Sequence, residues 1–133
     1  MRVTQARVAA VLLLTVRGTP TMHYGDEIGM VNVPVPPESV HDPVEKRLPG
    51  IGMGPDPQRA LLQWSERAYA GFSASAPWLP LANDFTIRNF EKQKNDSTSL
   101  LTLYRRLIEL RRQNEALSIG EYSPLPASGN LFA

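Results

Sequence analysis

Hydrophobic positions first appear as a nearly unbroken run of Ala, Leu and Val over residues 3–16. The polar residues Arg2, Gln5 and Arg7 are grouped at its start. A run that is apolar on most sides is typical of a helix that is covered by protein on most sides. We therefore expect a buried helix here, one that needs neighbours.

A short second run follows, in which Gly18 supplies a helix stop and residues 19–24 read as a buried strand closed by Gly25. A helix, a glycine and a short strand in this order predict the αβ step of a parallel sheet. The stretch after it, residues 26–81, is rich in proline and too long for an ordinary connector. Loops of that length in a compact domain are usually functional.

Helical spacing returns near the C-terminus, where three N-cap candidates precede a set of apolar positions three and four residues apart. The N-cap candidates are Asn95, Asp96 and Ser97, and the apolar positions are Leu100, Leu103, Tyr104, Leu107, Ile108 and Leu110. Glu109 has the spacing to pair with Arg105 and Arg112 on a solvated helix face. Such charges are fully explained by exposure to water. We expect no functional role for them.

The last part of the chain, residues 121–125, is predicted to begin a β-strand of a following domain. We place the domain boundary between residues 1–117 and 118–133. Two helices, one strand and a long loop cannot close a sheet or bury both faces of a core. The elements therefore indicate a piece of a larger α/β body.

The composition excludes several classes of protein and of binding site, but it does not identify the function. The 133 residues are 42% hydrophobic and 20% charged, as in an ordinary globular chain. The formal net charge of +1 gives no field that would favour a nucleic acid or an anionic membrane as partner. Cysteine is absent, which excludes disulfides and thiolate metal sites and fits a reducing, cytoplasmic compartment. His23 and His41 are too few for a zinc site, and we expect no metal and no cofactor.

A secretory signal is the alternative interpretation of the N-terminus, because Arg2 and Arg7 precede an apolar run. Arg17 ends that run where small residues would be needed, and no Ala-x-Ala pattern follows. The run is also shorter than the roughly 18 to 20 apolar residues that span a bilayer. These features favour the buried helix.

Three segments have distinctive residue patterns in a fixed order. They are residues 18–30 (GTPTMHYGDEIGM), then residues 56–64 (DPQRALLQW) with 70–73 (AGFS) and 77–80 (PWLP), and finally residues 99–112 (SLLTLYRRLIELRR). In order and spacing they resemble the α-amylase superfamily of glycoside hydrolases, in its α-glucosidase and oligo-1,6-glucosidase branch. The first resembles the eighth barrel strand and its exit, and the third is similar to the closing barrel helix. The second is similar to the loop usually written Arg-Thr-Pro-Met-Gln-Trp and Asn-Ala-Gly-Phe.

The resemblance implies that the chain is the last part of a (β/α)8 barrel: helix 7, strand 8, a long loop and helix 8, leading into an all-β domain. A complete barrel takes about 250 residues. The loop departs from the family where Thr-Pro-Met is replaced by Ala60-Leu61-Leu62 and where Tyr69 replaces Asn. By resemblance, these departures lie in the loop that shapes the pocket around the terminal sugar.

The chemistry implied by the resemblance is retaining hydrolysis by two carboxyl groups about 5 Å apart. By resemblance, none of the family's three catalytic acids lies in this chain, so we name no catalytic residue. The pair His41-Asp42 is similar to the end of the family's Asn-His-Asp motif, which contains one of the catalytic acids. However, the pair follows the expected eighth strand, whereas the motif precedes the seventh helix. We interpret it as a loop pair without a catalytic role.

Asp26 and Glu27 lie where the predicted strand ends, the face on which barrel active sites form. Neighbours on an extended segment point to opposite sides and cannot act as one catalytic pair. We favour a hydrogen bond to loop backbone, or an ion pair with an Arg, over substrate contact. Glu27 is kept as a candidate of the active-site loop.

Arg59 is the strongest candidate for substrate binding, because a guanidinium offers several donors in a fixed fork to vicinal hydroxyls. By resemblance, the matching Arg binds the non-reducing-end glucose and favours exo-action. The alternative is an ion pair with Asp56 or Glu66. Gln63 and Trp64 are further candidates of the active-site loop. The aromatic residues Trp64, Phe72 and Trp78 can stack on sugars, although aromatics at such turns more often anchor the loop.

The predicted function is therefore that of a fragment of an exo-acting α-glucosidase that supplies a substrate-binding loop for short oligosaccharides. The alternatives are a sucrose or trehalose isomerase, a transglucosidase, or a non-catalytic amylase-like barrel that serves as a partner subunit. The expected partners are an oligosaccharide and the remainder of the barrel. The isolated chain is expected to be inactive and to self-associate, because its helices would expose apolar faces.

Overall fold

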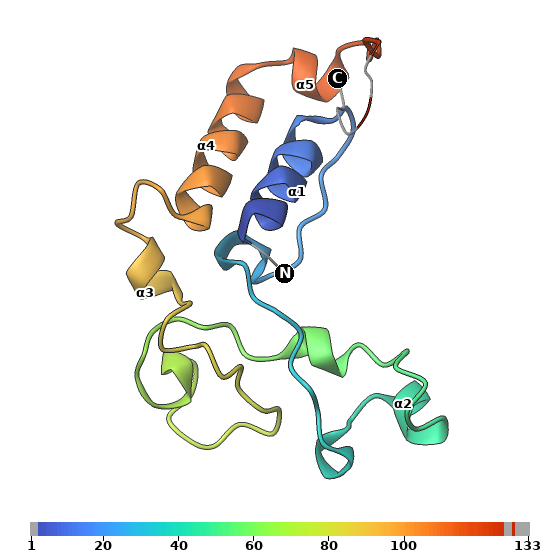
Figure 1. Ribbon diagram of the computed structural model, residues 1–133, viewed down its shortest axis with the longest axis vertical. Coiled ribbons are helices and arrows are strands. Elements are labelled where there is room, and N and C mark those ends of the chain that lie inside the picture. Colours follow the sequence, from blue (N-terminus) through green and yellow to red (C-terminus); the bar gives the residue numbers. More distant parts are fainter. Residues whose placement is uncertain (1–2, 127–128, 130–133) are drawn as a thin grey trace.

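The structure is a computed structural model that describes residues 3–126 and residue 129. Its main core is formed by two helices, α1 (Val3–Thr15) and α4 (Leu100–Gln113), which lie side by side. Figure 1 shows this helix pair at one end of the molecule and irregular loops at the other. We call residues 30–90 the loop lobe.

The two helices of the pair run parallel. Arg7, near the start of α1, donates to the carbonyl of Thr98, just before α4. At the other end, Arg111 of α4 donates to the carbonyl of Leu14 in α1 at 3.0 Å. Parallel neighbours joined by a long connection are the arrangement that βα units produce.

One face of α1 packs against one face of α4. The buried residues at this contact are Ala6, Ala10, Leu14, Leu100, Tyr104 and Leu107, with the partly buried Met22 and Leu103 beside them. The small Ala6 and Ala10 let the helices approach closely, and burial of Leu14 contributes about 2 kcal/mol. The prediction of a helix over residues 3–16 is confirmed, but this chain covers only one side of it: Val8 remains 64% exposed.

The N-cap of α4 is Ser99, whose side chain accepts from the backbone N–H of Thr102. The three predicted N-cap residues precede it and do not cap the helix, so that prediction was wrong. Asp96 instead accepts from the backbone N–H and the hydroxyl of Thr98 in a local turn. Ser, Asp and Asn compete for such positions because each offers a short acceptor side chain.

The predicted pairing of Glu109 with Arg105 and Arg112 does not occur in the structure. Glu109 accepts from the side-chain amide of Gln113, one turn further along α4, at 2.6 Å. Arg105 lies over the ring of Phe90, at 5.9 Å from its centroid. This face of α4 is exposed to water, as expected, but Glu109 and Arg105 form contacts other than the predicted ion pairs.

The predicted strand over residues 19–24 is irregular in the structure, so that prediction is not confirmed. A strand requires a neighbour for its N–H and C=O groups. Over the described ranges, 3–126 and 129, the structure contains no strand. The segment is held instead by Arg111, which donates to the carbonyls of Val16 and Gly18 beyond the end of α1.

The loop lobe consists of short helical turns joined by extended segments. These turns and those that flank the lobe are η1 (Asp26–Ile28), η2 (Pro37–Ser39), α2 (Pro43–Arg47), η3 (Asp56–Arg59), η4 (Ala68–Gly71) and α3 (Phe90–Gln93). A small second core of Val33, Ala60 and Ala82, with Met30 against it, holds distant parts of the lobe together. The long loop is therefore ordered by its own contacts.

One arginine side chain and one glutamine side chain connect the lobe to the helix pair. Arg88 donates to Asp84 and to the carbonyl of Gly29, each at 2.7 Å. Gln93 donates to the carbonyl of Ile28 and accepts from the backbone N–H of Leu101 at the start of α4. Through these bonds the turn at residues 25–29 is fixed to both parts.

After α4 the chain forms one more short helix, α5 (Ala116–Ile119). Residues 121–125 have no regular structure, so the strand predicted there is not confirmed. The remainder of the predicted β domain, residues 127–128 and 130–133, lies outside the described residues. No helix within the described part of the chain is both long and apolar enough to cross a membrane.

Candidate functional site

A pocket with a volume of about 420 Å³ opens in the loop lobe, beside the turn that follows residues 19–24. It is lined by Tyr24, Arg59, Ala60, Leu61, Leu62, Trp64, Phe72, Trp78 and Leu79. Arg59, the leading candidate from the sequence, is thus joined by Trp64 and by both other aromatic candidates. Spacing along the loop alone could not place Trp64, Phe72 and Trp78 in one pocket, because the turns of the loop decide where each side chain points.

Arg59 is the last residue of η3, and its side chain is exposed. It forms no ion pair within the part of the chain that the structure describes. The sequence offered Asp56 and Glu66 as possible ion-pair partners of Arg59. In the structure Glu66 pairs with Lys92 instead, at 2.9 Å. Asp56 contributes only at longer range, through its charge. The guanidinium therefore keeps its donors available to a ligand.

Asp56 is the buried carboxylate of the site, with 3% of its surface exposed. Its Oδ2 accepts from the backbone N–H groups of His41 at 2.7 Å and Asp42 at 2.8 Å. Burial favours a higher pKa, but these two donors and the positive charge of Arg59 together hold the pKa of Asp56 below its ordinary value. Asp56 is therefore an ionised anchor between η3 and the loop at residues 41–42.

That anchor supports one wall of the pocket. The ring of His41 meets the ring of Trp78 edge-on, with 4.3 Å between centroids. Asp42 caps α2 by accepting from the backbone N–H of Val44 and Glu45. His41 and Asp42 thus have structural contacts in this loop, and their lack of a catalytic role stays a prediction.

The part of the pocket lining at Trp64 is held by an unusual turn. Tyr69 and Ala70 in η4 have φ of 52° and 56°, a left-handed conformation that costs non-glycine residues about 1 kcal/mol or more each. The carbonyl of Ala70, at the centre of this turn, accepts from the backbone N–H groups of Trp64 and Ser65. The turn therefore fixes the backbone that carries the indole of Trp64.

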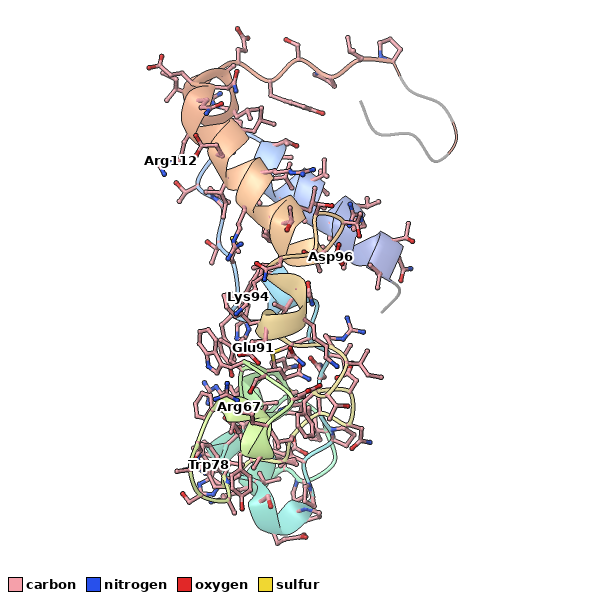
Figure 2. All side chains as sticks on the ribbon, turned by 90° about the vertical axis from the view of Figure 1, so that its left-hand side faces the viewer. Arg67, Trp78, Glu91, Lys94, Asp96 and Arg112 are labelled. Atoms are coloured by element: carbon pink, nitrogen blue, oxygen red, sulfur yellow. The ribbon has the colours of Figure 1, made fainter. Side chains whose placement is uncertain are left out.

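Trp64 and Trp78 are each about half exposed, at 43% and 57%. Trp64 contacts Phe90 edge-on at 5.5 Å, which leaves the rest of its indole in the pocket. Trp78 lies in the loop lobe on the side away from the helix pair (Figure 2). Both rings thus combine the two roles considered from the sequence: each anchors its loop and each presents surface to the pocket.

Gln63 does not line the pocket, although it directly precedes Trp64. Its side chain is fully buried and donates to Asp84 at 3.1 Å, and its carbonyl accepts from the backbone N–H of Phe90. Its Oε1 has no partner among the described residues. Gln63 therefore acts in this structure as a link between the pocket backbone and the Asp84–Arg88 pair.

Asp26 and Glu27 both accept hydrogen bonds from loop backbone. From the sequence we expected such a bond for at least one of them. Asp26 accepts from the N–H of His23, and Glu27 accepts from the N–H of Gly25 at 2.8 Å. The segment is a turn of 3₁₀ helix, so the extended conformation expected for it was wrong. Neither carboxylate lines the pocket, and together they raise the pKa of Tyr104, after the larger effect of its burial.

Sequence reasoning missed Tyr24 and underestimated Asp56. The hydroxyl of Tyr24 donates to the carbonyl of Ala60 at 3.0 Å and ties the turn to the pocket. Burial raises the pKa of Tyr24, and the charge of Arg59 acts against that rise. The Asp-Pro start of η3 was a signal for Asp56, because Asp and Pro are common where helical turns begin.

No carboxylate lines the pocket among the described residues, and their His, Asp and Glu side chains form no group of three that could hold a metal ion. The site therefore offers donors and aromatic surface. It offers no pair of carboxyl groups for general acid–base chemistry.

Comparison with known proteins gives a consistent picture. The profile of the family described as "Alpha amylase, catalytic domain" matches residues 1–120. A probable oligo-1,6-glucosidase of Bacillus subtilis is 33% identical over 146 aligned residues, which cover 96% of this chain and 26% of that protein. An oligo-1,6-glucosidase of Parageobacillus thermoglucosidasius is 31% identical, over 91% of this chain and 25% of the relative.

Among solved structures, the trehalulose synthase MutB of Pseudomonas mesoacidophila is similar with a TM-score of 0.82 and 30% identity. The match covers 94% of this chain and 26% of that enzyme. Such neighbours are (β/α)8-barrel enzymes, so the helix pair and the loop lobe have the arrangement of part of a barrel. The chain spans about a quarter of the length of the relatives that it matches.

Proposed function

Because the chain belongs to the alpha-amylase catalytic-domain family, we propose that it is the substrate-positioning quarter of an exo-acting α-glucosidase that cleaves short oligosaccharides. In this proposal the loop lobe supplies binding groups, and the catalytic acids belong to other parts of the barrel. The relatives named as oligo-1,6-glucosidases support the hydrolase assignment. The cytoplasmic location is part of the same proposal.

The observation that carries this proposal is the guanidinium of Arg59, which has no ion pair with any described residue and lies in a pocket with Trp64, Phe72 and Trp78. A planar cation with free donors suits the vicinal hydroxyls of a sugar, and exposed aromatic rings suit its apolar face. The pocket opens beside Tyr24, at the end of the segment that resembles a barrel strand. Active sites of barrels form at that end of the strands.

We assign α1 as helix 7, residues 19–24 as strand 8, the loop lobe as the active-site loop and α4 as helix 8. Residues 118–133 are assigned to the start of a β domain. The parallel packing of α1 and α4 supports this assignment, because consecutive helices around a barrel run parallel. The segment at 19–24 would become a strand once neighbouring strands satisfy its backbone.

The test is a chimera in which residues 3–117 replace the matched segment of the Bacillus subtilis relative. We expect it to hydrolyse p-nitrophenyl α-glucoside, and we expect the isolated chain not to. Arg59→Ala in the chimera should lower kcat/KM by about ten-fold or more, since a charged hydrogen bond contributes about 1.5–3 kcal/mol.

The matched control is Arg67→Ala, which removes an exposed loop arginine that pairs with Glu91 at 3.5 Å outside the pocket. A chimera with a cooperative thermal transition but no hydrolysis would count against the proposal. Equal losses in the Arg59 and Arg67 variants would remove Arg59 from the binding site.

Sucrose isomerisation is the second candidate function, and the similarity to a trehalulose synthase favours it. Hydrolases and isomerases on one scaffold differ in how far water is excluded from the glycosyl intermediate. Product analysis of the chimera with sucrose separates them: free glucose and fructose indicate hydrolysis, and a new disaccharide indicates isomerisation. A non-catalytic barrel is the weaker alternative, since Arg59 is retained and exposed in a formed pocket.

A further inference from the structure

Residues 59–64, which we call the pocket segment, supply most of the pocket lining, and Gln63 is the member of the segment that does not line the pocket. The side chain of Gln63 is fully buried, and its Nε2 donates to Oδ1 of Asp84 at 3.1 Å. Its Oε1 has no partner within the described residues. Among those residues, Asp84 is therefore the only hydrogen-bond partner of this side chain. Because a buried amide without partners is costly, loss of Asp84 would favour movement of the segment.

Asp84 also binds in the opposite direction, toward the turn at residues 25–29. Its Oδ2 accepts from Nε of Arg88 at 2.7 Å, and the same guanidinium donates to the carbonyl of Gly29 at 2.7 Å. Gly29 has a φ of 71°, and a Cβ at this position would lie 3.0 Å from Nη1 of Arg88 and 3.0 Å from Cδ2 of Leu100. The turn is therefore held closely between Arg88 and the start of α4. One carboxylate connects it to the pocket segment.

The backbone beside Gln63 is held by the same stretch of chain. The carbonyl of Gln63 accepts from the N–H of Phe90 at 2.9 Å, and the carbonyl of Trp64 accepts from the N–H of Glu91 at 3.0 Å. Phe90 and Glu91 begin α3, which lies between the loop lobe and the helix pair (Figure 1). Residues 84–91 thus hold the position of Trp64 by side-chain and backbone contacts, although none of them lines the pocket.

We propose that Asp84 is a positioning residue for substrate binding. With one oxygen toward Gln63 and the other toward Arg88, it holds the pocket segment in place relative to the turn at residues 25–29. Asp84 does not line the pocket, so it acts on a substrate only through residues that do. The substrate is the glucoside of the proposed function, and the kinetic part of this proposal rests on that function. The geometric part, the position of the pocket segment, does not depend on it.

Displacement of the pocket segment should weaken substrate binding more than it slows the chemical step. In the proposed function Arg59 binds the terminal sugar both before and during the reaction. Loss of an interaction that is equal in both states raises KM and leaves kcat nearly unchanged. In the chimera that carries residues 3–117, Asp84→Ala should raise KM for p-nitrophenyl α-glucoside by about five- to ten-fold, close to the effect of one hydrogen bond to a charged group.

Two further variants test whether the three side chains act as a unit. Asp84→Asn keeps an acceptor for Arg88 and an amide group beside Gln63, so KM should rise only about two- to three-fold, as neutral hydrogen bonds replace charged ones. Arg88→Ala breaks the contact with Gly29 and should also raise KM. The double variant Asp84→Ala/Arg88→Ala should raise KM no further than the larger single change, because residues in one network are not additive.

Arg111→Ala is the control for a general loss of stability. Arg111 binds the carbonyls of Leu14 and Val16, at the end of the helix pair that is distant from the loop lobe (Figure 1). Its removal should lower the thermal midpoint and leave KM unchanged. A residue that only stabilises the fold behaves in this way. Asp84→Ala should instead change KM at temperatures where both variants are folded.

The second readout uses the 133-residue chain and does not require catalysis. The sequence has two Trp residues, so Trp78→Phe leaves Trp64 as the only one. In this background Asp84→Ala should shift the emission of Trp64 to longer wavelength and increase its quenching by acrylamide, because the indole loses its edge contact with Phe90. Arg111→Ala should change neither. Far-UV circular dichroism of each variant shows whether the helix pair is retained.

Three results would overturn the proposal: an unchanged Trp64 emission in Asp84→Ala, an unchanged KM in the Asp84→Ala chimera, or equal changes of KM in the Asp84 and Arg111 variants. If the emission shifts but the chimera hydrolyses no glucoside, the proposed function fails and Asp84 still positions the pocket segment. If the chimera is active and Asp84→Ala changes neither KM nor emission, the proposed function stands and the role of Asp84 is rejected.

Discussion

The carboxylate of Asp56 lies 2.7 Å from the backbone nitrogen of His41, a residue 15 positions earlier in the chain. The ring of His41 in turn meets Trp78, which lines the pocket. One buried charge in η3 therefore sets the position of an aromatic wall that is distant in sequence. The contact also makes the loop lobe sensitive to acid.

The first prediction concerns pH. The pKa of Asp56 is lowered in the folded chain, so its ionised form stabilises the fold fully above the unfolded pKa of about 3.9. This contribution is lost as the pH falls through the lower, folded pKa. We expect the urea midpoint, followed by tryptophan emission, to fall as the pH is reduced below about 4. Asp56→Asn should lower stability at pH 7 and flatten this acid dependence.

The control for that experiment is Asp26→Asn. Asp26 is exposed, and among the described residues its carboxylate accepts only from the N–H of His23, so its removal should change tryptophan emission little. An acid transition that is unchanged in Asp56→Asn would show that other carboxylates control it. Glu66 and Asp96 are the alternatives, because the pKa of each is also lowered, by hydrogen bonds from Lys92 and Thr98 respectively.

The second prediction concerns the end of α1. Arg111 donates to the carbonyls of Leu14, Val16 and Gly18, which lack helical partners. Arg111→Ala should lower the free energy of unfolding by about 1–3 kcal/mol. Arg112→Ala is the control, because Arg112 lies on the exposed side of α4, away from α1 (Figure 2). Similar losses in the two variants would indicate a general charge effect.

The third prediction concerns the left-handed turn in η4. Tyr69→Asn should raise stability by about 0.5–1 kcal/mol, because Asn tolerates the φ of 52° far better than Tyr does. The measurement is the thermal midpoint. Ala74→Gly, at an exposed position outside the residues with positive φ, should leave stability unchanged or lower it. A destabilised Tyr69→Asn would mean that contacts of the Tyr ring outweigh the backbone strain.

The fourth prediction concerns the uncovered face of α1. Val8 and Leu12 are exposed on the side opposite to α4, together with Val11. We expect the isolated chain to sediment as a concentration-dependent oligomer, because this apolar face has no partner. Val8→Lys with Leu12→Glu should shift it toward monomer, whereas the exposed Leu125→Lys should not. A monomeric original chain at high concentration would contradict this expectation.

Local patterning was sufficient for the parts of the fold that stabilise themselves along the chain. The apolar run at residues 3–16 and the spacing from Leu100 to Leu110 predicted both long helices, because a helix satisfies its backbone within its own segment. Local patterning also predicted strands at residues 19–24 and 121–125, but both segments are irregular in the structure. A strand satisfies its backbone only with a neighbour, and the neighbours are absent from the described residues.

By itself, the sequence determined the family, the helix pair and Arg59 as the leading binding residue, since these depend on residue identities at short spacing. Only the tertiary structure decided that Arg59 has no ion pair within residues 3–126, that Gln63 is buried outside the pocket lining and that Asp56 anchors His41. These outcomes depend on which groups compete for the same donors and charges once distant segments meet. Glu66 binds Lys92 and Asp56 binds backbone N–H groups, and that competition leaves the guanidinium of Arg59 free for a ligand.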